Sequence, residues 1–266
     1  MPELPDVESF KRTAAKCVGR TVHRVSVGDP RMLKGTTATT VQRRLTGGRV
    51  SSVSRYGKHL FLNFARAGAV EMHFGMNGSL RLVKEKEADP AYARFMLFLD
   101  RGDRLAYLNP RRIGDVMLVT DVASFVAESQ LGPDALDRRL TLDAFRQLLA
   151  ERKRDVKSVL MDQSCLAGIG NIYSDEILFQ ARIHPAARAD TLPPDHVHRL
   201  FKSMKHVLKT AVARRAGSED AMERLPRGFL LRERHRGGHC PRCGTVLATV
   251  KRAGRTSYNC PRCQKA

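Results

Sequence analysis

Four cysteines near the end of the chain have the spacing of a metal site. Cys240 and Cys243 form one C-x2-C pair, Cys260 and Cys263 form a second, and 16 residues separate the pairs. Each pair offers two thiolates from one tight turn, which suits a tetrahedral zinc ion, and four thiolates leave no position for a reacting water. The pattern therefore predicts one structural zinc. Two disulfides, or cysteines without a shared role, are the alternatives, and a cytoplasmic location favours zinc over both.

The opening residues, MPELPDVE, combine prolines with acidic side chains. Pro5 suits the first turn of a helix, where Asp6 and Glu8 complement the positive end of the helix dipole. The residue types alone therefore predict a helix start. They leave open whether Pro2 and Glu3 have a further role.

A glycine-rich turn, LAGIGN, runs from Leu166 to Asn171 and precedes a helical segment. Glycine lets a backbone approach a phosphate closely, and the N–H groups at a helix start bind anions. An ordinary tight turn between helices fits the motif equally well. The basic composition of the chain favours a DNA phosphate.

Two turns in the first half of the chain carry apolar or basic side chains. HFGMNG places Met76 at an Asn-Gly hairpin tip, and NPRRIG places Arg111 and Ile113 on a second turn. Apolar side chains act as wedges between bases in some DNA-bending proteins. A core position is the alternative for Met76, and the residue types alone do not decide between the two.

The hydrophobic pattern predicts the elements that must position these residues. From Arg20 to about Asp121 apolar residues alternate with period two between Gly, Asn-Gly and Asn-Pro turns, which indicates a β-sandwich or barrel. From about Ser124 the period is helical. Between the cysteine pairs, residues 245–251 and 256–259 read as strands joined at Ala253-Gly254, which predicts a β-hairpin zinc finger.

The clearest helix lies near the middle of the second half. Apolar residues recur every three or four positions from Val197 to Val212, which is typical of an amphipathic helix. Pro193 and Pro194 are placed where a helix start tolerates proline, and Gly217 is predicted to end the helix.

Charge indicates the partner. The chain has 266 residues, a formal net charge of +20 and a pI of about 10.4, with 42% hydrophobic residues. Such a surface attracts nucleic acid, because each neutralised phosphate releases condensed counterions. Trp is absent and aromatic residues are 6%, which favours duplex over stacked single strands. No apolar run approaches the roughly 18 residues of a membrane span, and a cytoplasmic protein is expected.

Together these segments resemble the formamidopyrimidine-DNA glycosylase / endonuclease VIII family. The matching segments are PELPDVE, RYGKHLFL, HFGMNGSL, NPRRIG, LGPDAL, LMDQSCLAGIGNIYSDEILF and the tail C-x2-C…GRTSYNCPRC. They cover nearly the whole chain in the family's order. The resemblance implies an α+β multidomain fold: an N-terminal β-sandwich catalytic domain (1–123), a helical domain with a helix-two-turn-helix (124–217), and a basic linker with a four-cysteine zinc finger (218–266).

The resemblance also implies an activity. Family members are bifunctional enzymes that excise oxidised bases from duplex DNA, here with formamidopyrimidines or 8-oxoguanine favoured, and then cleave the abasic site by β,δ-elimination. It implies that Met1 is removed and that the amine of Pro2 forms a Schiff base with the sugar. An α-amine has a pKa of about 8, so a useful fraction is neutral at pH 7, unlike a lysine. Damaged double-stranded DNA, one zinc, a monomer and a cytoplasmic, nucleoid-associated location are expected.

Two further catalytic residues follow from the resemblance. Glu3 matches the carboxylate that moves protons at the sugar ring during ring opening. Lys58 matches the lysine that contacts the phosphate beside the lesion and assists catalysis.

The DNA-binding residues are implied in the same way. Met76, Arg111 and Ile113 match the positions that fill the gap left by an everted nucleotide. Asn171, in the glycine turn, and Arg255, in the zinc hairpin, match residues that grip phosphates.

Three departures from the family pattern bear on the lesion that is preferred. Asp6 stands where Glu is usual, and Ile113 stands where Phe is usual. The segment from Gly217 to Cys240 is shorter than in the oxidised-purine branch, where it includes a loop over the flipped base. An oxidised-pyrimidine glycosylase is therefore an alternative, as is a non-catalytic or abasic-site-specific damage-binding homologue.

A third class is a metal-dependent nuclease, which would need a carboxylate cluster. Glu3, Asp6 and Glu8 are the nearest candidates for it. The presence of Pro2 and Lys58 beside Glu3 favours the glycosylase and lyase, since DNA binding alone needs no free proline amine.

Overall fold

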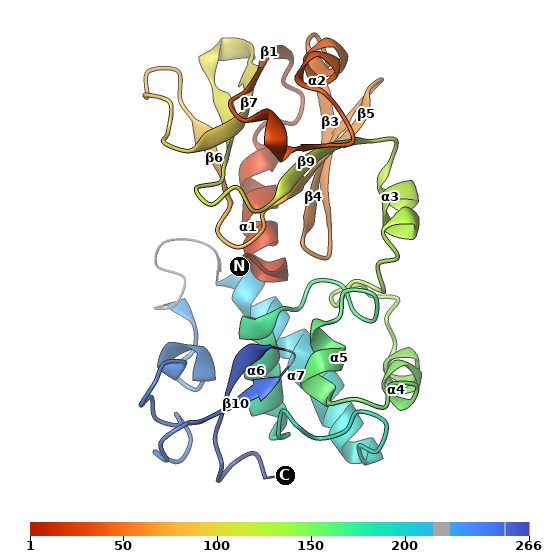
Figure 1. The fold of residues 1–266 in the computed structure, drawn as a ribbon, viewed down its shortest axis with the longest axis vertical. Helices are drawn as coiled ribbons and strands as arrows, with labels where there is room; N and C mark the ends of the chain where they lie inside the picture. The colour runs from red at the N-terminus through yellow and green to blue at the C-terminus, as the bar shows by residue number, and fades with distance from the viewer. Residues whose placement is uncertain (215–223, 253, 266) are drawn as a thin grey trace. The chain divides into compact units, whose positions relative to one another are not determined.

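The computed structural model describes residues 1–214, 224–252 and 254–265 (Figure 1). The chain divides into two compact units, Met1–Pro2 with Asp6–Gln130 and Glu3–Pro5 with Leu131–Ala266. The first unit is built mainly from strands and the second mainly from helices with one strand pair. The α+β fold class expected from the sequence is confirmed.

Two sheets make up the first unit. One has the strand order β1-β7-β8-β6 and the other β2-β9-β5-β4-β3, and all neighbours are antiparallel except β2 and β9. The four strands of the first sheet are β1 (Val22–Val27), β6 (Ser79–Val83), β7 (Ala93–Leu99) and β8 (Arg104–Leu108). The five strands of the second are β2 (Leu33–Lys34), β3 (Val50–Tyr56), β4 (His59–Phe64), β5 (Gly68–His73) and β9 (Asp115–Val119).

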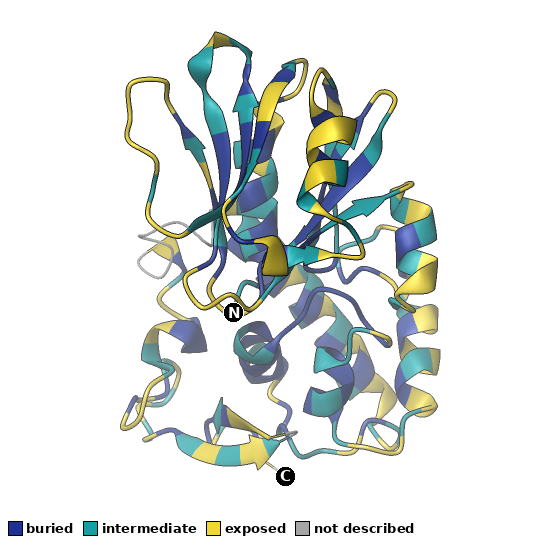
Figure 2. Ribbon diagram, turned by 45° about the horizontal axis from the view of Figure 1, so that its top comes forward, coloured by how far each residue is buried: buried dark blue, intermediate teal, exposed yellow. Residues whose placement is uncertain are grey.

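A helix completes the core between these sheets. The unit's helices are α1 (Leu4–Ala15), α2 (Ala38–Leu45) and α3 (Val122–Glu128), with 3₁₀ turns η1 (Pro30–Met32) and η2 (Asp100–Gly102). Val7, Phe10 and Ala14 of α1 are buried with apolar residues of both sheets, and Figure 2 shows these faces as the buried part of the unit. The Phe10 and Phe74 rings lie 4.5 Å apart. Because α1 begins at Leu4, the predicted helix start is confirmed.

The second unit contains four α-helices among the described residues. Its elements are α4 (Leu142–Ala150), α5 (Val156–Met161), α6 (Asn171–Ala181), α7 (Pro194–Ala213), the 3₁₀ turn η3 (Leu230–Glu233) and the strands β10 (Ala248–Arg252) and β11 (Arg255–Asn259). Thr141 and Asp155 cap α4 and α5, each accepting a hydrogen bond from the backbone N–H three residues on.

The helix predicted around Val197 is α7. It begins at Pro194, with Pro193 as the capping residue, as the sequence indicates. Gly217, predicted to end it, and Ala253, in the predicted turn of the zinc hairpin, lie outside the described residues, as does the 217/218 domain boundary. In the part of the chain that the structure covers, no helix has an apolar stretch long enough to cross a bilayer.

The prediction of a hairpin around Met76 is wrong. The Asn-Gly turn connects β5, in the five-stranded sheet, to β6, in the four-stranded sheet, so the flanking strands do not pair with each other. The NPRRIG turn likewise joins β8 to β9 and crosses from one sheet to the other. Both turns are therefore connections between the sheets of the sandwich.

Candidate functional site

The carboxylate of Glu3 caps the start of α6. Its Oε2 accepts hydrogen bonds from the backbone N–H groups of Gly170 (2.7 Å) and Tyr173 (3.1 Å), and its Oε1 accepts one from Ile172 (2.8 Å). The side chain is buried, with 1% of its residue surface exposed. A negative charge at this end of a helix is stabilised by the unpaired amides and by the helix dipole. Glu3 is therefore held in one position and orientation.

The glycine turn makes room for this carboxylate. A Cβ atom on Gly170 would lie 2.4 Å from Glu3 Cδ, and one on Gly168 would lie 2.6 Å from Leu4 Cδ1. The Leu4 N–H donates to the carbonyl oxygen of Gly168 at 3.0 Å, so the chain start lies against the turn through both backbone and side chain.

Three amide groups at the start of α6 are therefore already used. The prediction that they hold a DNA phosphate is wrong for Gly170, Ile172 and Tyr173, whose N–H groups donate to Glu3. The residue types gave no sign of this, because the carboxylate comes from the other end of the chain.

Pro2 immediately precedes Glu3 and belongs to the first unit. With Met1 in place its nitrogen is part of a peptide bond and has no lone pair available for attack. Lys58 is also in the first unit, in the turn between β3 and β4, and is 6% exposed.

A group of titratable side chains follows Lys58 on the five-stranded sheet. His59 pairs with His73 across β4 and β5, and His73 pairs with Asp115 on β9. Glu71 is two residues from His73 and therefore lies on the same face. The His59 Nδ1 and Glu71 Oε1 atoms form a 2.7 Å hydrogen bond, and the rings of His59 and His73 are 5.0 Å apart. The sequence analysis did not identify this group.

Burial sets the protonation of this group. Glu71 is 1% exposed, and burial followed by the charge of Asp115 raises its pKa well above the usual range. Burial lowers the pKa of His59 and of His73 to about 4. Near neutral pH both imidazoles are therefore uncharged, and Glu71 holds its proton to a higher pH than an exposed carboxyl does.

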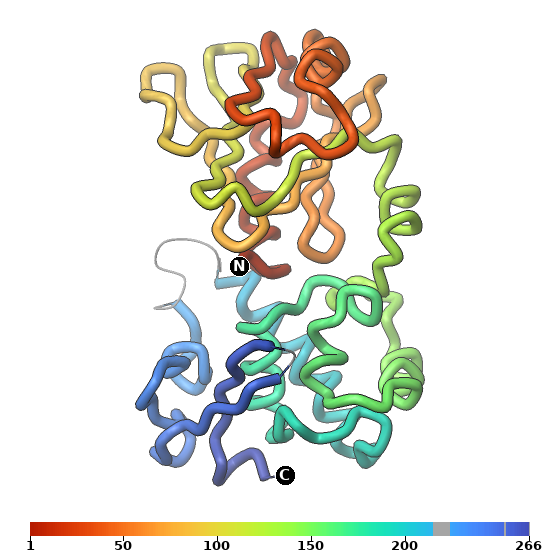
Figure 3. The backbone as a smooth tube through the Cα atoms, viewed as in Figure 1, coloured from red at the N-terminus to blue at the C-terminus, as the bar shows by residue number. Residues whose placement is uncertain are grey.

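The two turns that join the sheets present exposed apolar side chains. Met76 is 44% exposed and Ile113 is 42% exposed, although large hydrophobic residues are normally buried, and Arg111 is exposed as well. The core alternative for Met76 is excluded. The turns contact each other, because a Cβ on Gly75 would fall 1.3 Å from the carbonyl oxygen of Ile113 (Figure 3).

Asn109 holds the second turn in shape, a role that the sequence analysis missed. It is 0% exposed. Its Oδ1 accepts from the Ile113 N–H at 3.2 Å, and its Nδ2 donates to the Ile113 carbonyl at 3.1 Å and to Tyr107 Oη at 3.0 Å. A buried amide with its donors and acceptor satisfied fixes a loop more tightly than exposed turn residues do.

Asn171 and Arg255, the predicted phosphate ligands of the second unit, come from elements in contact. Asn171 Nδ2 donates to the Thr256 carbonyl oxygen at 3.2 Å, and Thr256 follows Arg255 on β11. Arg255 is exposed. Asn171 is the first residue of α6, so the amides that hold Glu3 flank it.

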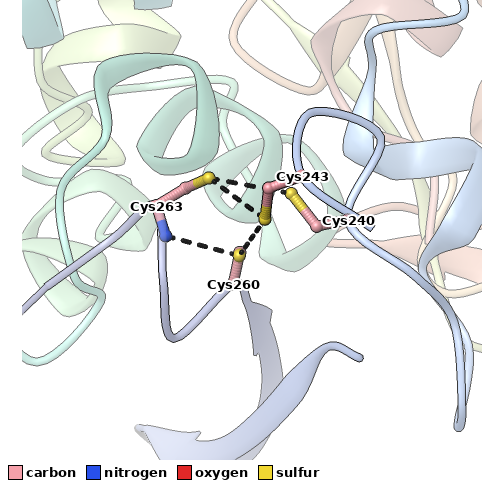
Figure 4. Close-up of side chains that lie close together, drawn as sticks. All are labelled: Cys240, Cys243, Cys260 and Cys263. Carbon is pink, nitrogen blue, oxygen red and sulfur yellow. Dashed lines mark hydrogen bonds between the residues drawn. The ribbon is translucent and has the colours of Figure 1, made fainter. Parts of the chain in front are cut away.

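The four terminal cysteines converge as the spacing predicts (Figure 4). Their Sγ atoms all lie within 4.8 Å of one another, with Cys243–Cys260 and Cys243–Cys263 at 3.5 Å and Cys240–Cys263 at 3.9 Å. Thiolates around a tetrahedral zinc at about 2.3 Å are about 3.8 Å apart, so the group fits one structural ion. This confirms the predicted zinc site.

Within the described ranges, these cysteines are the one group of three or more His, Cys, Asp or Glu residues whose ligand atoms come close enough to hold a metal. The carboxylates considered for a nuclease do not form such a group. Glu3 is bound to backbone amides, and Glu8 pairs with Arg55 at 2.9 Å and with Lys11 at 3.4 Å.

Three family models match the chain in order. Residues 1–116 match the formamidopyrimidine-DNA glycosylase N-terminal domain, residues 131–222 match the formamidopyrimidine-DNA glycosylase H2TH domain, and residues 237–266 match a zinc finger found in FPG and IleRS. Among curated proteins, the formamidopyrimidine-DNA glycosylase of Heliobacterium modesticaldum is 35% identical and that of Thermomicrobium roseum is 37% identical, over 100% and 99% of each chain.

Solved structures agree. The Lactococcus lactis formamidopyrimidine-DNA glycosylase is similar, with a TM-score of 0.88 and 28% identity in a complex with DNA containing an AP site. A complex of that enzyme with DNA containing Fapy-dG has a TM-score of 0.89 and 28% identity. Each comparison covers 99% of this chain and 100% of the other. The chain belongs to the formamidopyrimidine-DNA glycosylase family.

Proposed function

We propose that this protein excises oxidised bases from duplex DNA and then cleaves the resulting abasic site by β,δ-elimination, using the amine of Pro2 as its nucleophile. Membership of the family makes it a DNA glycosylase for damaged bases, and AP lyase activity is typical of the family. The observation that carries the mechanism is the burial of Glu3, held by three amides, next to Pro2 in the chain.

Removal of Met1 would turn Pro2 into a secondary amine. That amine attacks C1′ of the damaged nucleotide, the base leaves with a proton, and the sugar ring opens as an iminium forms on the Pro2 nitrogen. The cation acidifies the C2′ hydrogen, so loss of that proton expels the 3′ phosphate. A second elimination expels the 5′ phosphate, and water releases the remaining sugar fragment from Pro2.

Glu3 is suited to the proton transfers of this sequence. Its fixed carboxylate can take the proton that the Pro2 amine loses on attack and pass it to the ring oxygen as the ring opens, while the departing base takes its proton from solvent. The fixed position of Glu3 favours this role, because a catalytic group that is already oriented loses no further conformational entropy in the transition state.

The remaining site residues would bind DNA. We assign Lys58 to the phosphate beside the lesion, and Met76, Arg111 and Ile113 to the space left by the everted nucleotide. The exposure of Met76 and Ile113 supports this assignment. We assign Asn171 and Arg255 to backbone phosphates.

Four cysteines, Cys240, Cys243, Cys260 and Cys263, would hold the zinc, which stabilises the hairpin and takes no part in the reaction. The net charge of +20 supports duplex DNA as the partner and strong salt dependence of binding. We further propose that the protein acts as a monomer on nucleoid DNA in the cytoplasm.

We propose oxidised purines, with formamidopyrimidines favoured, as the preferred lesions. Support comes from the curated relatives, which are named for this substrate, and from the Lactococcus lactis enzyme, which has been crystallised with Fapy-dG DNA. Excision assays on matched duplexes bearing a formamidopyrimidine, 8-oxoguanine or an oxidised pyrimidine test the order. Preference for the oxidised pyrimidine would contradict the assignment.

The lyase mechanism is tested by trapping. The protein is first shown by mass spectrometry to lack Met1, and is then incubated with an abasic duplex and sodium borohydride. We expect one covalent adduct per chain, mapped to the Pro2 nitrogen by mass spectrometry, and none with protein that keeps Met1, in which the Pro2 nitrogen is part of a peptide bond. An untrapped but folded wild-type protein, or an adduct mapped to a lysine, would contradict Pro2 as the nucleophile.

A further inference from the structure

Asp175, on α6, is a buried carboxylate with four hydrogen-bond donors. Oδ1 accepts from Lys157 Nζ (2.5 Å) and Ser257 Oγ (2.6 Å), and Oδ2 accepts from Arg234 Nε (2.9 Å) and the Tyr258 N–H (3.1 Å). Its side chain and that of Lys157 are both 0% exposed. Every lone-pair direction of the carboxylate is thus occupied.

The donors come from separate parts of the second unit. Lys157 is on α5, Arg234 directly follows η3, and Ser257 and Tyr258 are on β11. One carboxylate therefore joins α5, α6, the segment after η3 and the zinc hairpin. Ser257 is two residues from Arg255, the predicted phosphate ligand, so Asp175 fixes the strand that begins with Arg255.

A second set of bonds joins β11 to the start of α6. The Thr256 carbonyl oxygen accepts from Asn171 Nδ2 at 3.2 Å and from Arg234 Nη2 at 3.4 Å, and Arg234 Nη2 also donates to the Asn171 carbonyl at 3.4 Å. The hairpin is thus fastened to α6 at both ends of one helical turn, at Asn171 and at Asp175.

That same turn holds Glu3. The amides of Gly170, Ile172 and Tyr173 that donate to its carboxylate lie within five residues of Asp175 in the chain. The start of this turn is tied to the residues that follow it, because the Gly170 carbonyl oxygen accepts a hydrogen bond from the Ser174 N–H at 3.1 Å. A displacement of β11 would therefore change the orientation of the amides that position Glu3.

The buried charges of Asp175 and Lys157 cost desolvation free energy. Burial lowers the pKa of Lys157, and the charge of Asp175 only partly opposes this. Buried ion pairs are often replaced by apolar residues without loss of stability, and their best-attested use is to select one arrangement over others. The group is therefore better explained by positioning than by stability alone.

We propose that Asp175 is a positioning residue that couples the zinc hairpin to the helix end holding Glu3, so that the hairpin influences the rate of base excision as well as DNA affinity. This rests on the proposed function, in which Glu3 acts during excision and Arg255 binds a phosphate. A hairpin that only bound DNA would affect affinity alone.

Ser257→Ala is the decisive variant, because it removes one hydrogen bond to Asp175 without leaving a buried charge unpaired. Its matched control is Ser164→Ala, which removes a 2.7 Å bond from an exposed serine to Asp162. For each protein the zinc content, the dissociation constant for an uncleavable lesion duplex and the single-turnover excision rate at saturating enzyme are measured.

We expect Ser257→Ala to keep one zinc and to lose about tenfold in the excision rate at saturation, with Ser164→Ala equal to wild type. Arg255→Ala should weaken binding to the uncleavable duplex, because it removes the proposed phosphate contact. A Ser257→Ala protein that differs from wild type only in its dissociation constant, or not at all, would overturn the coupling.

Asp175→Asn provides a second measurement. It leaves Lys157 and Arg234 partly uncompensated, so its folding is checked by zinc content and circular dichroism, and it should excise more slowly than Ser257→Ala. A folded Asp175→Asn protein with the wild-type saturated rate also contradicts the proposal. If the wild-type protein itself excises no base, it is the proposed function that fails, and the two failures are thereby distinguished.

Discussion

Glu3 Oε2 lies 2.7 Å from the backbone nitrogen of Gly170, a hydrogen bond between residues 167 positions apart in the chain. Through this bond, the start of α6 holds the carboxylate of Glu3, the residue that directly follows the proposed nucleophile Pro2. Gly170 contributes only its backbone N–H to this bond. A side chain added at position 170 therefore changes the position of Glu3 without removing the donor.

Gly170→Ala should displace Glu3. The added Cβ would lie 2.4 Å from Glu3 Cδ and 2.5 Å from Oε1, while the φ of −127° suits any residue, so the effect is steric and not a matter of backbone strain. We expect excision to slow by about 100-fold, the loss seen when a group that stabilises the transition state is misplaced. The measurement is single-turnover excision on a lesion duplex.

Gly228→Ala is the matched control for that change, because nothing lies within 4 Å of the Cβ it would add. It should excise like the wild type. Equal rates for the Gly170 and Gly228 variants would show that the position of Glu3 does not limit excision.

Glu71→Gln should stabilise the protein increasingly as the pH rises. Burial raises the pKa of Glu71 well above 4.5, so the folded state keeps a proton that the unfolded state releases. Its contribution is therefore most favourable below about pH 4.5 and is lost as the pH rises toward the folded-state pKa. Glutamine cannot ionise and avoids this loss. The free energy of unfolding of the wild type and of Glu71→Gln is measured with denaturant at pH 5 and at pH 8. If the difference between the two proteins is the same at both pH values, the prediction is contradicted.

Met76→Ala and Ile113→Ala should slow base removal more than strand cleavage. Both side chains are exposed on contacting turns and are assigned to the gap beside an everted base, so their loss makes eversion less favourable. We expect about 10-fold to 100-fold slower excision of a base lesion, but less than about threefold slower cleavage of a preformed abasic site.

Val18→Ala serves as the control for these truncations, because Val18 is also an exposed apolar residue, at 44%, but lies outside both turns. It should match wild type on both substrates. If abasic cleavage fell as far as excision in the Met76 variant, the side chain would act on general DNA binding and not on eversion.

Zinc removal should abolish DNA binding by disordering the hairpin that bears Arg255. Cys240 and Cys260 are buried, and the ion would link the two cysteine turns through four Zn–S bonds, which chelation removes. Chelation is expected to lower both the melting temperature and the affinity for duplex, and re-added zinc to restore them. Cys165→Ser, outside the metal group, should still bind one zinc per chain.

Local patterns predicted the local parts of this structure. The zinc site follows from two short cysteine motifs, and the start of α7 follows from Pro194 and apolar spacing, because each is decided by residues close in sequence. The turn around Met76 shows the limit: Asn-Gly chemistry predicts a tight turn, but which strands pair depends on the rest of the sandwich. Here β5 pairs with β4 and β9 instead of β6.

The candidate site could be predicted only in part for the same reason. Glu3, Lys58 and Asn171 were identified by resemblance, but the bond from Glu3 to Gly170 joins distant segments that no local pattern relates. Asp175, Asn109 and the Glu71 group were missed because a buried polar residue in a helix or strand has no distinctive spacing. Its role becomes visible only when its partners are brought together.

The contact between the chain start and the glycine turn also sets how far the terminal nitrogen lies from Glu3. Leu4 is fixed by its 3.0 Å backbone bond to Gly168, and Glu3 is fixed by its carboxylate. The distance from Glu3 to the terminal amine therefore depends on how many residues precede Glu3, and a chain that begins at Pro2 has one. Each additional or missing residue would move the terminal nitrogen by up to about 3.5 Å. If Pro2 is the nucleophile, as proposed, removal of Met1 must occur at this one peptide bond, and an N-terminal tag that stays attached would give a folded protein without the proposed nucleophile.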